Sequence, residues 1–418
     1  MKLKFSTLRN IVVGLLLLIL GTVVGYRYAN GTLPIDIRLS FLEQPRTSSL
    51  AKLVGSSEPP ENKEVDFDVF WEVWGLLEKD YLNPEELDTE EMVDGAIVGM
   101  TRAVGDPYTI YLPPEENKRS GENLAGKFYG VGIELGYIDQ TLAVISPLDG
   151  TPAAEAGLQA GDLILHVKDE KKDIDEDTTD WSLDEAVNKI RGEKGTPVQF
   201  TIYREEADEP FKVVVKRDEI VVESVTLEKK EVSGKYVAHL RVSKFGGRTE
   251  SEWNQAVGDI LSEKDQLAGI VLDLRNNPGG FFDTSIVLAS DFIEQGTVVA
   301  QKGKYQEKTF TAKGEARLED IPVVILVNKG SASASEILAG ALRDKINAKL
   351  VGQKTFGKGT VQDRREVSNG GGVHITVGRW LLPDGGWIHE EGLDVDVEVE
   401  QNPDNEGDEV LQKAVEQL

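Results

Sequence analysis

Residues 322–341, PVVILVNKGSASASEILAGA, predict a buried strand, a tight turn and a helix in direct succession. Val323–Val327 is an unbroken aliphatic run of strand length, which is typical of a strand covered on both faces in a parallel sheet. The polar segment NKG ends this run, and apolar residues recur at helical spacing from Ser333 onward. The sequence therefore predicts that the Ser333 hydroxyl lies at a helix N-terminus inside an α/β domain.

Ser333 has two interpretations at this position. Together with Glu336 it forms the S-x-x-E pattern of a capping box, which stabilises a helix by about 1 kcal/mol and has no chemical role. A helix N-terminus also carries unpaired N–H groups and the positive end of the helix dipole, which stabilise developing negative charge as an oxyanion hole does. On this stretch alone, the capping role is favoured.

A lysine 25 residues later changes this balance. Lys358 lies between Gly357 and Gly359 in TFGKGTVQ, where a backbone without side chains can approach another segment closely and bring the amine into a dry crevice. Burial lowers a lysine pKa by up to ~3–5 units, and a neutral lysine can take the proton of a serine hydroxyl. If this segment is a strand, the even offset puts Gln362 on the same face as Lys358, where its amide would hold the amine.

The segments GSASASEILAGAL and TFGKGTVQ resemble the two catalytic motifs of the carboxyl-terminal processing (tail-specific) peptidases, serine proteases with a Ser-Lys dyad. The resemblance extends from about Phe67 to the C-terminus. It implies that Ser333 is the nucleophile, Lys358 the general base and Gln362 the partner of that base.

A second strand-turn-helix pattern precedes the first. Residues 269–275 predict a buried strand, and the loop NNPGG leads from it into a helix. Because α/β sheets place their sites at the carboxyl ends of parallel strands, this loop and the Ser333 turn are expected to face each other. The family resemblance implies that the N–H groups of Gly279 and Ala334 form the oxyanion hole, with Gly280 as an alternative to Gly279.

Residues 118–217 predict a domain of short strands and two brief helices that resembles a PDZ domain. In the segment YGVGIEL, the backbone N–H groups of Gly130, Val131, Gly132 and Ile133 would bind the terminal carboxylate of a peptide, which would pair with the following strand edge. An ordinary hairpin turn is the alternative for this glycine pattern. The acidic insert KDEKKDIDEDTTD is expected to be a solvated loop, because it lacks the glycine and terminal glutamate of a calcium site.

Residues 1–30 predict insertion into a membrane. Lys2, Lys4 and Arg9 precede an uncharged run over residues 11–26, which is slightly long for a signal-peptide core and short for a spanning helix. We expect a retained single-pass anchor, with a cleaved signal sequence as the alternative. The basic residues keep the N-terminus in the cytoplasm, so the body is expected in the periplasm or at the cell surface, or secreted if the segment is cleaved.

The remaining segments complete a multidomain α/β organisation. Residues 31–65 are rich in Ser, Pro and charge, which predicts a linker. Residues 66–117 carry aromatic residues at helical spacing and predict a small helical domain that ends at the turn DPYT, 106–109. The family resemblance implies that this domain forms a homodimer. Residues 218–400 are expected to form the protease core with parallel strands, and residues 401–418 an acidic helix.

Composition restricts the partners. The chain has 418 residues and a formal net charge of −27, which argues against nucleic acid and anionic membrane surfaces as partners because both need a basic patch. The absence of cysteine excludes disulfides and thiolate metal sites. No cofactor or metal is implied.

We therefore expect an extracytoplasmic serine endopeptidase that acts on polypeptides with disordered C-terminal tails, whose free carboxyl end the PDZ-like domain recognises. One alternative from another class is a membrane-tethered PDZ scaffold or chaperone built on an inactive protease core, which need not retain the dyad. Another is a histidine-dependent hydrolase. It would require His374 or His389 beside Ser333.

Overall fold

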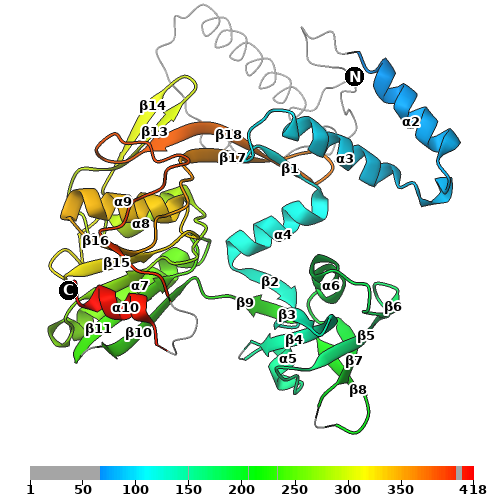
Figure 1. The fold of residues 1–418 in the computed structure, drawn as a ribbon, viewed down its shortest axis with the longest axis horizontal. Coiled ribbons are helices and arrows are strands. Elements are labelled where there is room, and N and C mark those ends of the chain that lie inside the picture. The colour runs from blue at the N-terminus through cyan, green and yellow to red at the C-terminus, as the bar shows by residue number, and fades with distance from the viewer. Residues whose placement is uncertain (1–65, 149, 206, 233, 402–406) are drawn as a thin grey trace, which may run out of the picture. The chain divides into compact units, whose positions relative to one another are not determined.

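The computed structural model describes residues 66–148, 150–205, 207–232, 234–401 and 407–418 (Figure 1). The expected anchor, residues 1–30, and the linker, residues 31–65, lie outside these ranges. Within them, no helix is both long and apolar enough to cross a membrane. The chain divides into two units, Met1–Pro84 and Glu85–Leu418, which are described separately.

The described part of the first unit contains helix α2 (Asp68–Asp80). Its aromatic side chains contact one another along the helix, with the rings of Phe70 and Trp74 6.0 Å apart. Several apolar side chains of this segment remain exposed, among them Phe67 at 52% and Trp71 at 61%. The helical pattern of the sequence is thus present, and α2 by itself leaves these apolar side chains exposed.

The second unit begins with the short 3-10 turn η1 (Pro84–Glu86) at the boundary and helix α3 (Thr89–Arg102). The Asp88 carboxylate caps α3 by accepting the N–H groups of Glu90 (2.7 Å) and Glu91 (3.0 Å). Strand β1 (Ile110–Leu112) and helix α4 (Pro114–Ala125) follow. The DPYT turn lies between α3 and β1, so the position of β1 decides where this turn is held.

The PDZ-like residues form a five-stranded antiparallel path with one additional strand. Its members, in sheet order, are β3 (Ile133–Ile138), β4 (Thr141–Pro147), β5 (Leu163–Asp169), β7 (Pro197–Tyr203) and β8 (Phe211–Lys216). The brief helices are α5 (Pro152–Glu155) and α6 (Leu183–Ile190), and β2 (Lys127–Gly130) pairs with β9 (Asp218–Val221) at the domain entrance and exit.

The acidic insert is not the solvated loop that its composition predicts. Strand β6 (Ile174–Asp177) pairs antiparallel with β5, so that Lys168 faces Asp175 across the hairpin. Asp173, at φ 56°, makes the turn, and the Ile174 side chain is buried. One apolar residue and cross-strand ion pairs such as Lys168–Asp175 (2.9 Å) therefore order a segment that is mostly charged. Among the described residues, no acidic group has the arrangement of a metal site.

The protease-like part contains the predicted parallel sheet. Strand β10 (Val225–Val232) pairs antiparallel with β11 (Lys235–Val242). Four strands then continue in parallel: β12 (Ile270–Asp273), β15 (Val323–Val327), β16 (Lys349–Gly352) and β19 (Val397–Glu398). The aliphatic run Val323–Val327 is strand β15, which lies inside this sheet between β12 and β16.

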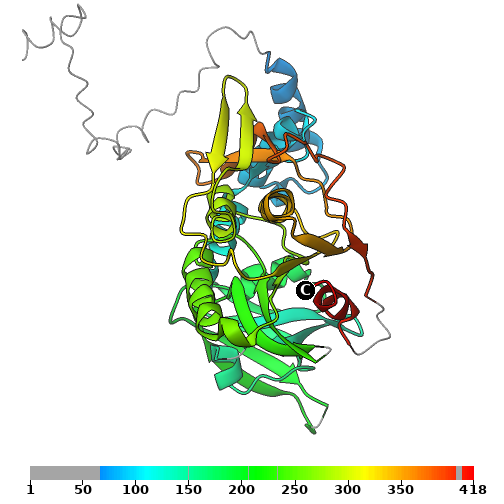
Figure 2. The same cartoon turned by 90° about the vertical axis from the view of Figure 1, so that its left-hand side faces the viewer.

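Helices cover both faces of this sheet (Figures 1 and 2). One face packs against α7 (Thr249–Glu263), α8 (Phe282–Ala289) and α9 (Ala334–Ile346), and the other against α10 (Glu409–Val415). A short 3-10 turn, η2 (Lys264–Gln266), follows α7. In β15, Ile325 and Val327 belong to the first cluster and Val324 and Leu326 to the second, as alternation along a strand requires. The acidic C-terminal helix thus forms one side of the core.

A second, antiparallel sheet was not predicted as such from the sequence. Its path is β1, β18 (Gly372–Leu381), β13 (Thr297–Gly303) and β14 (Glu307–Thr311), and β17 (Thr360–Glu366) also pairs with β18. In the register of β1 with β18, Ile110 faces His374. Both β1, which follows the DPYT turn, and β17, which follows Lys358 and contains Gln362, pair with β18. The sheet therefore brings together two segments that are far apart in the sequence.

Candidate active site

Ser333 is the N-cap of α9, in a sharp turn after β15. Its backbone has φ 56° and ψ −114°, a conformation that costs a residue with a side chain about 1–3 kcal/mol and persists only where the surroundings fix it. The Ser331 hydroxyl supplies part of that support by donating to the Leu274 carbonyl (2.8 Å). A strained serine at a strand-to-helix turn is the arrangement by which hydrolases expose a nucleophile.

The NNPGG loop faces the Ser333 turn, as expected for two loops at the carboxyl ends of adjacent parallel strands. The Asn277 carbonyl accepts the Ala332 N–H (3.0 Å) and the Ser335 hydroxyl (2.9 Å). Gly279 has φ 99°, and a Cβ there would lie 2.8 Å from the Ser333 Cβ and 3.0 Å from the Ala334 nitrogen. Only glycine allows this approach.

The Gly279 N–H donates to the Asn277 carboxamide oxygen (2.9 Å) in this structure. The Gly279 N–H would have to break this hydrogen bond before it could bind an oxyanion. The N–H of Gly280, the next residue in the same loop, is the alternative donor. The oxyanion assignment of Ala334 with Gly279, or with Gly280, stays a prediction.

Glu336 connects the nucleophile turn to the lysine loop. Its side chain is 0% exposed and accepts four hydrogen bonds. The donors are the Ser333 N–H (2.7 Å), the Thr355 hydroxyl (2.6 Å), the Gly357 N–H (2.6 Å) and the Lys358 N–H (2.9 Å). Burial raises the pKa of this carboxyl, and the four hydrogen bonds oppose that shift. One carboxylate thus fixes two segments whose proposed catalytic residues are 25 positions apart.

The Lys358 amine is partly buried beside the DPYT turn. Its Nζ lies over the Tyr108 ring, 5.1 Å from the centroid. Burial lowers the lysine pKa, and the carboxylates of Asp106 and Glu336 oppose that shift. This direction favours the neutral amine that a general base needs. Between these described residues, no hydrogen bond joins the Lys358 amine to the Ser333 hydroxyl.

The strand offset from which Gln362 was predicted to share a face with Lys358 is not present in the structure. Strand β17 begins only at Thr360, and its pairing shifts register between Val361 and Gln362, so the even offset from Lys358 does not define a common face. The Gln362 amide donates to the hydroxyls of Thr360 (3.0 Å) and Thr376 (3.1 Å). Its role as the direct partner of the amine stays a prediction.

The DPYT turn is the part of this site that sequence reasoning missed. Asp106 accepts the Tyr108 N–H (3.0 Å) and the Thr109 hydroxyl (2.6 Å), and the Thr109 hydroxyl accepts the Thr376 N–H (3.1 Å). The turn is visible in the sequence. Its place beside Lys358 follows from the β1–β18 pairing, which depends on residues more than 250 positions apart and has no local signal.

Two histidines lie around the same region. The His389 Nδ1 accepts the Gly359 N–H (3.3 Å), and its ring stacks on Trp387. The His374 Nε2 is buried, and no residue in the described ranges hydrogen-bonds to it. Neither imidazole hydrogen-bonds to Ser333, so the described structure gives the histidine-dependent alternative no support.

Of the predicted peptide-binding residues, Gly130 ends β2, Val131 and Gly132 form the connection, and Ile133 begins β3. Gly132 has φ 80°, and a Cβ there would lie 2.4 Å from the Thr151 Cβ. The Val131 carbonyl accepts the Ala153 N–H (2.9 Å), and the Gly132 carbonyl accepts the Leu148 N–H (2.9 Å). Since β3 is the terminal strand of its sheet path, its outer edge is the one to which a peptide strand would add.

Models of three known families match this chain. The model of peptidase family S41 matches residues 236–399, that of the PDZ domain residues 114–203, and that of the N-terminal domain of the activating protease CtpB residues 29–116.

Curated relatives include probable CtpA-like serine proteases of Staphylococcus epidermidis and Staphylococcus aureus. Each is 39% identical, over 78% of this chain and 64% of its own length, so the chain spans less than two thirds of these relatives. Among solved structures, a putative S41 protease from Bacteroides fragilis aligns with a TM-score of 0.50 at 16% identity, over 82% of this chain and 92% of its own. That likeness concerns the fold alone.

Proposed function

The chain belongs to peptidase family S41, the carboxyl-terminal processing proteases, and from this membership we propose that it is a serine endopeptidase with a Ser-Lys dyad. The observation that carries the proposal is the buried Glu336 carboxylate, which accepts the backbone N–H groups of both Ser333 (2.7 Å) and Lys358 (2.9 Å). This shared acceptor holds the backbones of the two residues in a fixed relative position, which a dyad requires. The strained backbone of Ser333 and the burial of Lys358 support the same roles.

In the proposed reaction, the neutral Lys358 amine takes the Ser333 proton as the hydroxyl oxygen attacks a peptide carbonyl. The Ala334 N–H and an N–H of the Gly279–Gly280 pair stabilise the oxyanion. The carbon–nitrogen bond breaks as Lys358 returns the proton to the leaving amine, and an ester with Ser333 remains. Water then hydrolyses this ester by the same route, and the free hydroxyl is restored.

We further propose that the substrates are polypeptides with disordered C-terminal tails. The loop residues Gly130, Val131, Gly132 and Ile133 would bind the free carboxyl end, while the dyad cuts elsewhere in the same tail. The outer edge of β3 supports this proposal, because it leaves backbone groups for an added strand. An inactive scaffold remains the alternative, and the activity of dyad variants separates the two.

Amidating the C-terminus of a substrate peptide is expected to raise its KM by about tenfold, because the amide loses charge-assisted hydrogen bonds to this loop. Steady-state cleavage of a free-acid peptide and its amide by the intact protein measures the difference. Gly132→Ala should remove the preference, since the new Cβ would clash with Thr151. Gly157→Ala is the matched control, because Gly157 has a similar φ of 81° with no atom near the added Cβ. Equal KM values for both peptides with the wild-type protein would contradict tail recognition.

For the location, we propose that residues 1–30 anchor the protein in the cell membrane and that the body lies outside the cytoplasm. The support is the order of basic and uncharged residues in the sequence. Protease treatment of intact cells should digest the body, whereas a cytoplasmic control protein survives. Protection of the body in intact cells would contradict this topology.

We also propose a homodimer through the helical segment. The exposed apolar side chains of α2, such as Trp71 at 61%, would be covered by a second copy. A monomer in sedimentation velocity would contradict it.

A further inference from the structure

The amine of Lys358 contacts an aromatic ring in this structure and not the Ser333 hydroxyl. It lies over the face of the Tyr108 ring, 5.1 Å from the centroid, within the distance at which an aromatic face attracts an ammonium group. Burial raises the pKa of the Tyr108 phenol, and the Glu336 carboxylate contributes to that shift. The phenol therefore stays neutral, and the ring acts on the amine through its face and not through a phenolate charge.

Asp106 fixes the turn that carries this ring. Its carboxylate accepts the Tyr108 N–H (3.0 Å) and the Thr109 hydroxyl (2.6 Å), which closes the turn. The Asp106 carboxylate also interacts with the Thr376 hydroxyl, which accepts a hydrogen bond from the Gln362 amide (3.1 Å). Asp106 thus connects the turn that carries Tyr108 to Gln362 through Thr376.

We propose that Asp106 and Tyr108 are positioning residues for the general base, and that together they form the seat that holds the protonated Lys358 amine while it is not bonded to Ser333. This inference rests on the proposed role of Lys358. The ammonium group must release one proton to solvent and leave the ring before the amine can accept the proton of Ser333. Attraction between the ammonium group and this seat therefore opposes deprotonation of Lys358. The strength of that attraction sets the pH above which the amine is neutral and can act as a base.

The sign of the effect follows from the groups around the amine. Burial lowers the Lys358 pKa, whereas the ring face and the Asp106 carboxylate favour the charged form and raise it. Of the other titratable groups, Glu336 raises it too, and His374, near Arg364, lies within electrostatic reach of the amine. His389 lies beside Tyr108. Loss of the ring or of the Asp106 charge should therefore lower the pKa further.

We expect Tyr108→Leu and Asp106→Asn each to move the acid limb of the kcat/KM profile to lower pH, by about half a unit to one unit. Tyr108→Phe keeps the ring and should retain the acid limb of the wild type. A structural role alone would reduce activity without this displacement of the limb.

Two remote substitutions are matched controls. In Tyr305→Leu, the lost ring also lies 5.1 Å from a lysine amine, that of Lys304, but is 88% exposed on the β13–β14 hairpin. In Asp384→Asn, the carboxylate also accepts an N–H two residues later, that of Gly386 (2.7 Å). Neither should move the limb.

A second readout does not depend on proteolysis. In the Ser333→Ala protein, the acetylation rate of each lysine against pH, followed by peptide mass mapping, gives the Lys358 pKa directly, with Lys304 as internal reference. A lower Lys358 pKa when Tyr108→Leu or Asp106→Asn is added supports the seat, even if these variants are inactive. An unchanged or higher pKa in both overturns it. The Ser-Lys proposal would survive failure of the seat if the wild type cleaves peptides and Lys358→Ala does not.

Discussion

Ser333→Ala and Lys358→Ala are each expected to lower kcat/KM for a flexible peptide by at least about a thousandfold, while the protein stays folded. The hydroxyl is a weak nucleophile without the amine, and the amine has nothing to activate without the hydroxyl. Lys358→Arg should not restore activity, because a guanidinium stays protonated at any pH at which the protein is folded. Peptide cleavage and circular dichroism on the same samples measure both properties.

Two controls separate chemistry from structure in this experiment. Ser182 is the N-cap of α6 and accepts the Glu185 N–H (3.2 Å), so Ser182→Ala removes a helix cap, costs about 1 kcal/mol of stability and spares activity. Lys354→Ala removes an exposed lysine that pairs with Asp394 (2.9 Å). Retained turnover in Lys358→Ala would contradict the Ser-Lys mechanism and make His374 and His389 the next bases to test.

The Ser333 turn was predictable because all of its determinants are local. The aliphatic run, the polar break and the helical spacing lie within twenty residues, and the structure has β15 and α9 where they indicate. The approach of the Gly279 loop was predictable from a general rule, since loops after adjacent parallel strands lie at one edge of the sheet.

The environment of Lys358 was not predictable in the same way. Glu336 was visible as a capping residue, but its bonds to Thr355 and Gly357 depend on how a distant loop crosses the helix N-terminus. The position of Gln362 depends on a register shift in β17, and that of Tyr108 on the pairing of β1 with β18. A turn pattern such as DPYT predicts the local backbone shape but not which distant residues lie beside the turn.

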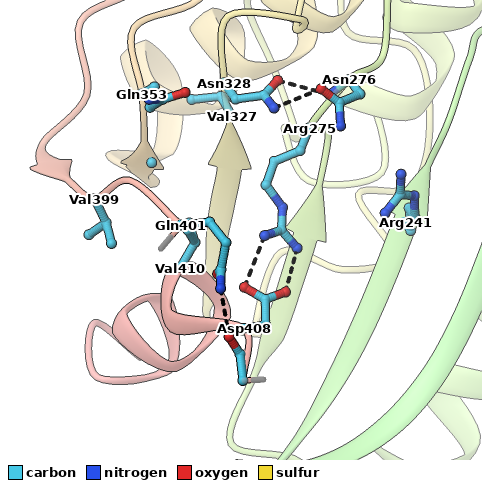
Figure 3. A pocket seen from close by; sticks show the side chains of 12 residues that line it. Arg241, Arg275, Asn276, Val327, Asn328, Gln353, Val399, Gln401, Asp408 and Val410 are labelled. Carbon is cyan, nitrogen blue, oxygen red and sulfur yellow. Dashed lines mark hydrogen bonds and ion pairs between the residues drawn. The ribbon is translucent and has the colours of Figure 1, made fainter. Parts of the chain in front are cut away.

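The pocket beside the C-terminal helix illustrates the same limit (Figure 3). Arg275 pairs with Asp273 on its own strand side (2.6 Å) and with Asp408 at the N-cap of α10 (2.8 Å). Asn276 and Asn328 also bond side chain to side chain at the strand ends (2.8 Å). The Arg275–Asp408 pair attaches the last helix to the sheet, a role that its acidic composition alone does not show.

Glu336→Ala is expected to have the second large effect, on stability and activity together. It leaves the three N–H groups of Ser333, Gly357 and Lys358 and the Thr355 hydroxyl without their acceptor. Buried unpaired donors cost about 1–3 kcal/mol each before relaxation, so we expect a loss of about 3–5 kcal/mol in the free energy of unfolding and at least a hundredfold loss in kcat/KM. Urea unfolding and peptide cleavage measure the two quantities.

Glu336→Gln makes the test sharper because it preserves volume. The remaining amide oxygen can accept from one pair of donors only, either the Ser333 and Lys358 N–H groups or the Thr355 hydroxyl and the Gly357 N–H. The amide NH₂ faces the other pair, so the four hydrogen bonds can no longer all form. Activity should fall between those of the wild type and Glu336→Ala. Glu185→Gln is the matched control, since Glu185 also stands three residues after a serine N-cap but is only partly buried and pairs with Lys189 (3.0 Å). If Glu336→Gln and Glu336→Ala both behaved like this control, with a loss of about 0.5 kcal/mol and full activity, Glu336 would be a helix cap only, and the connection between Ser333 and Lys358 would have no part in catalysis.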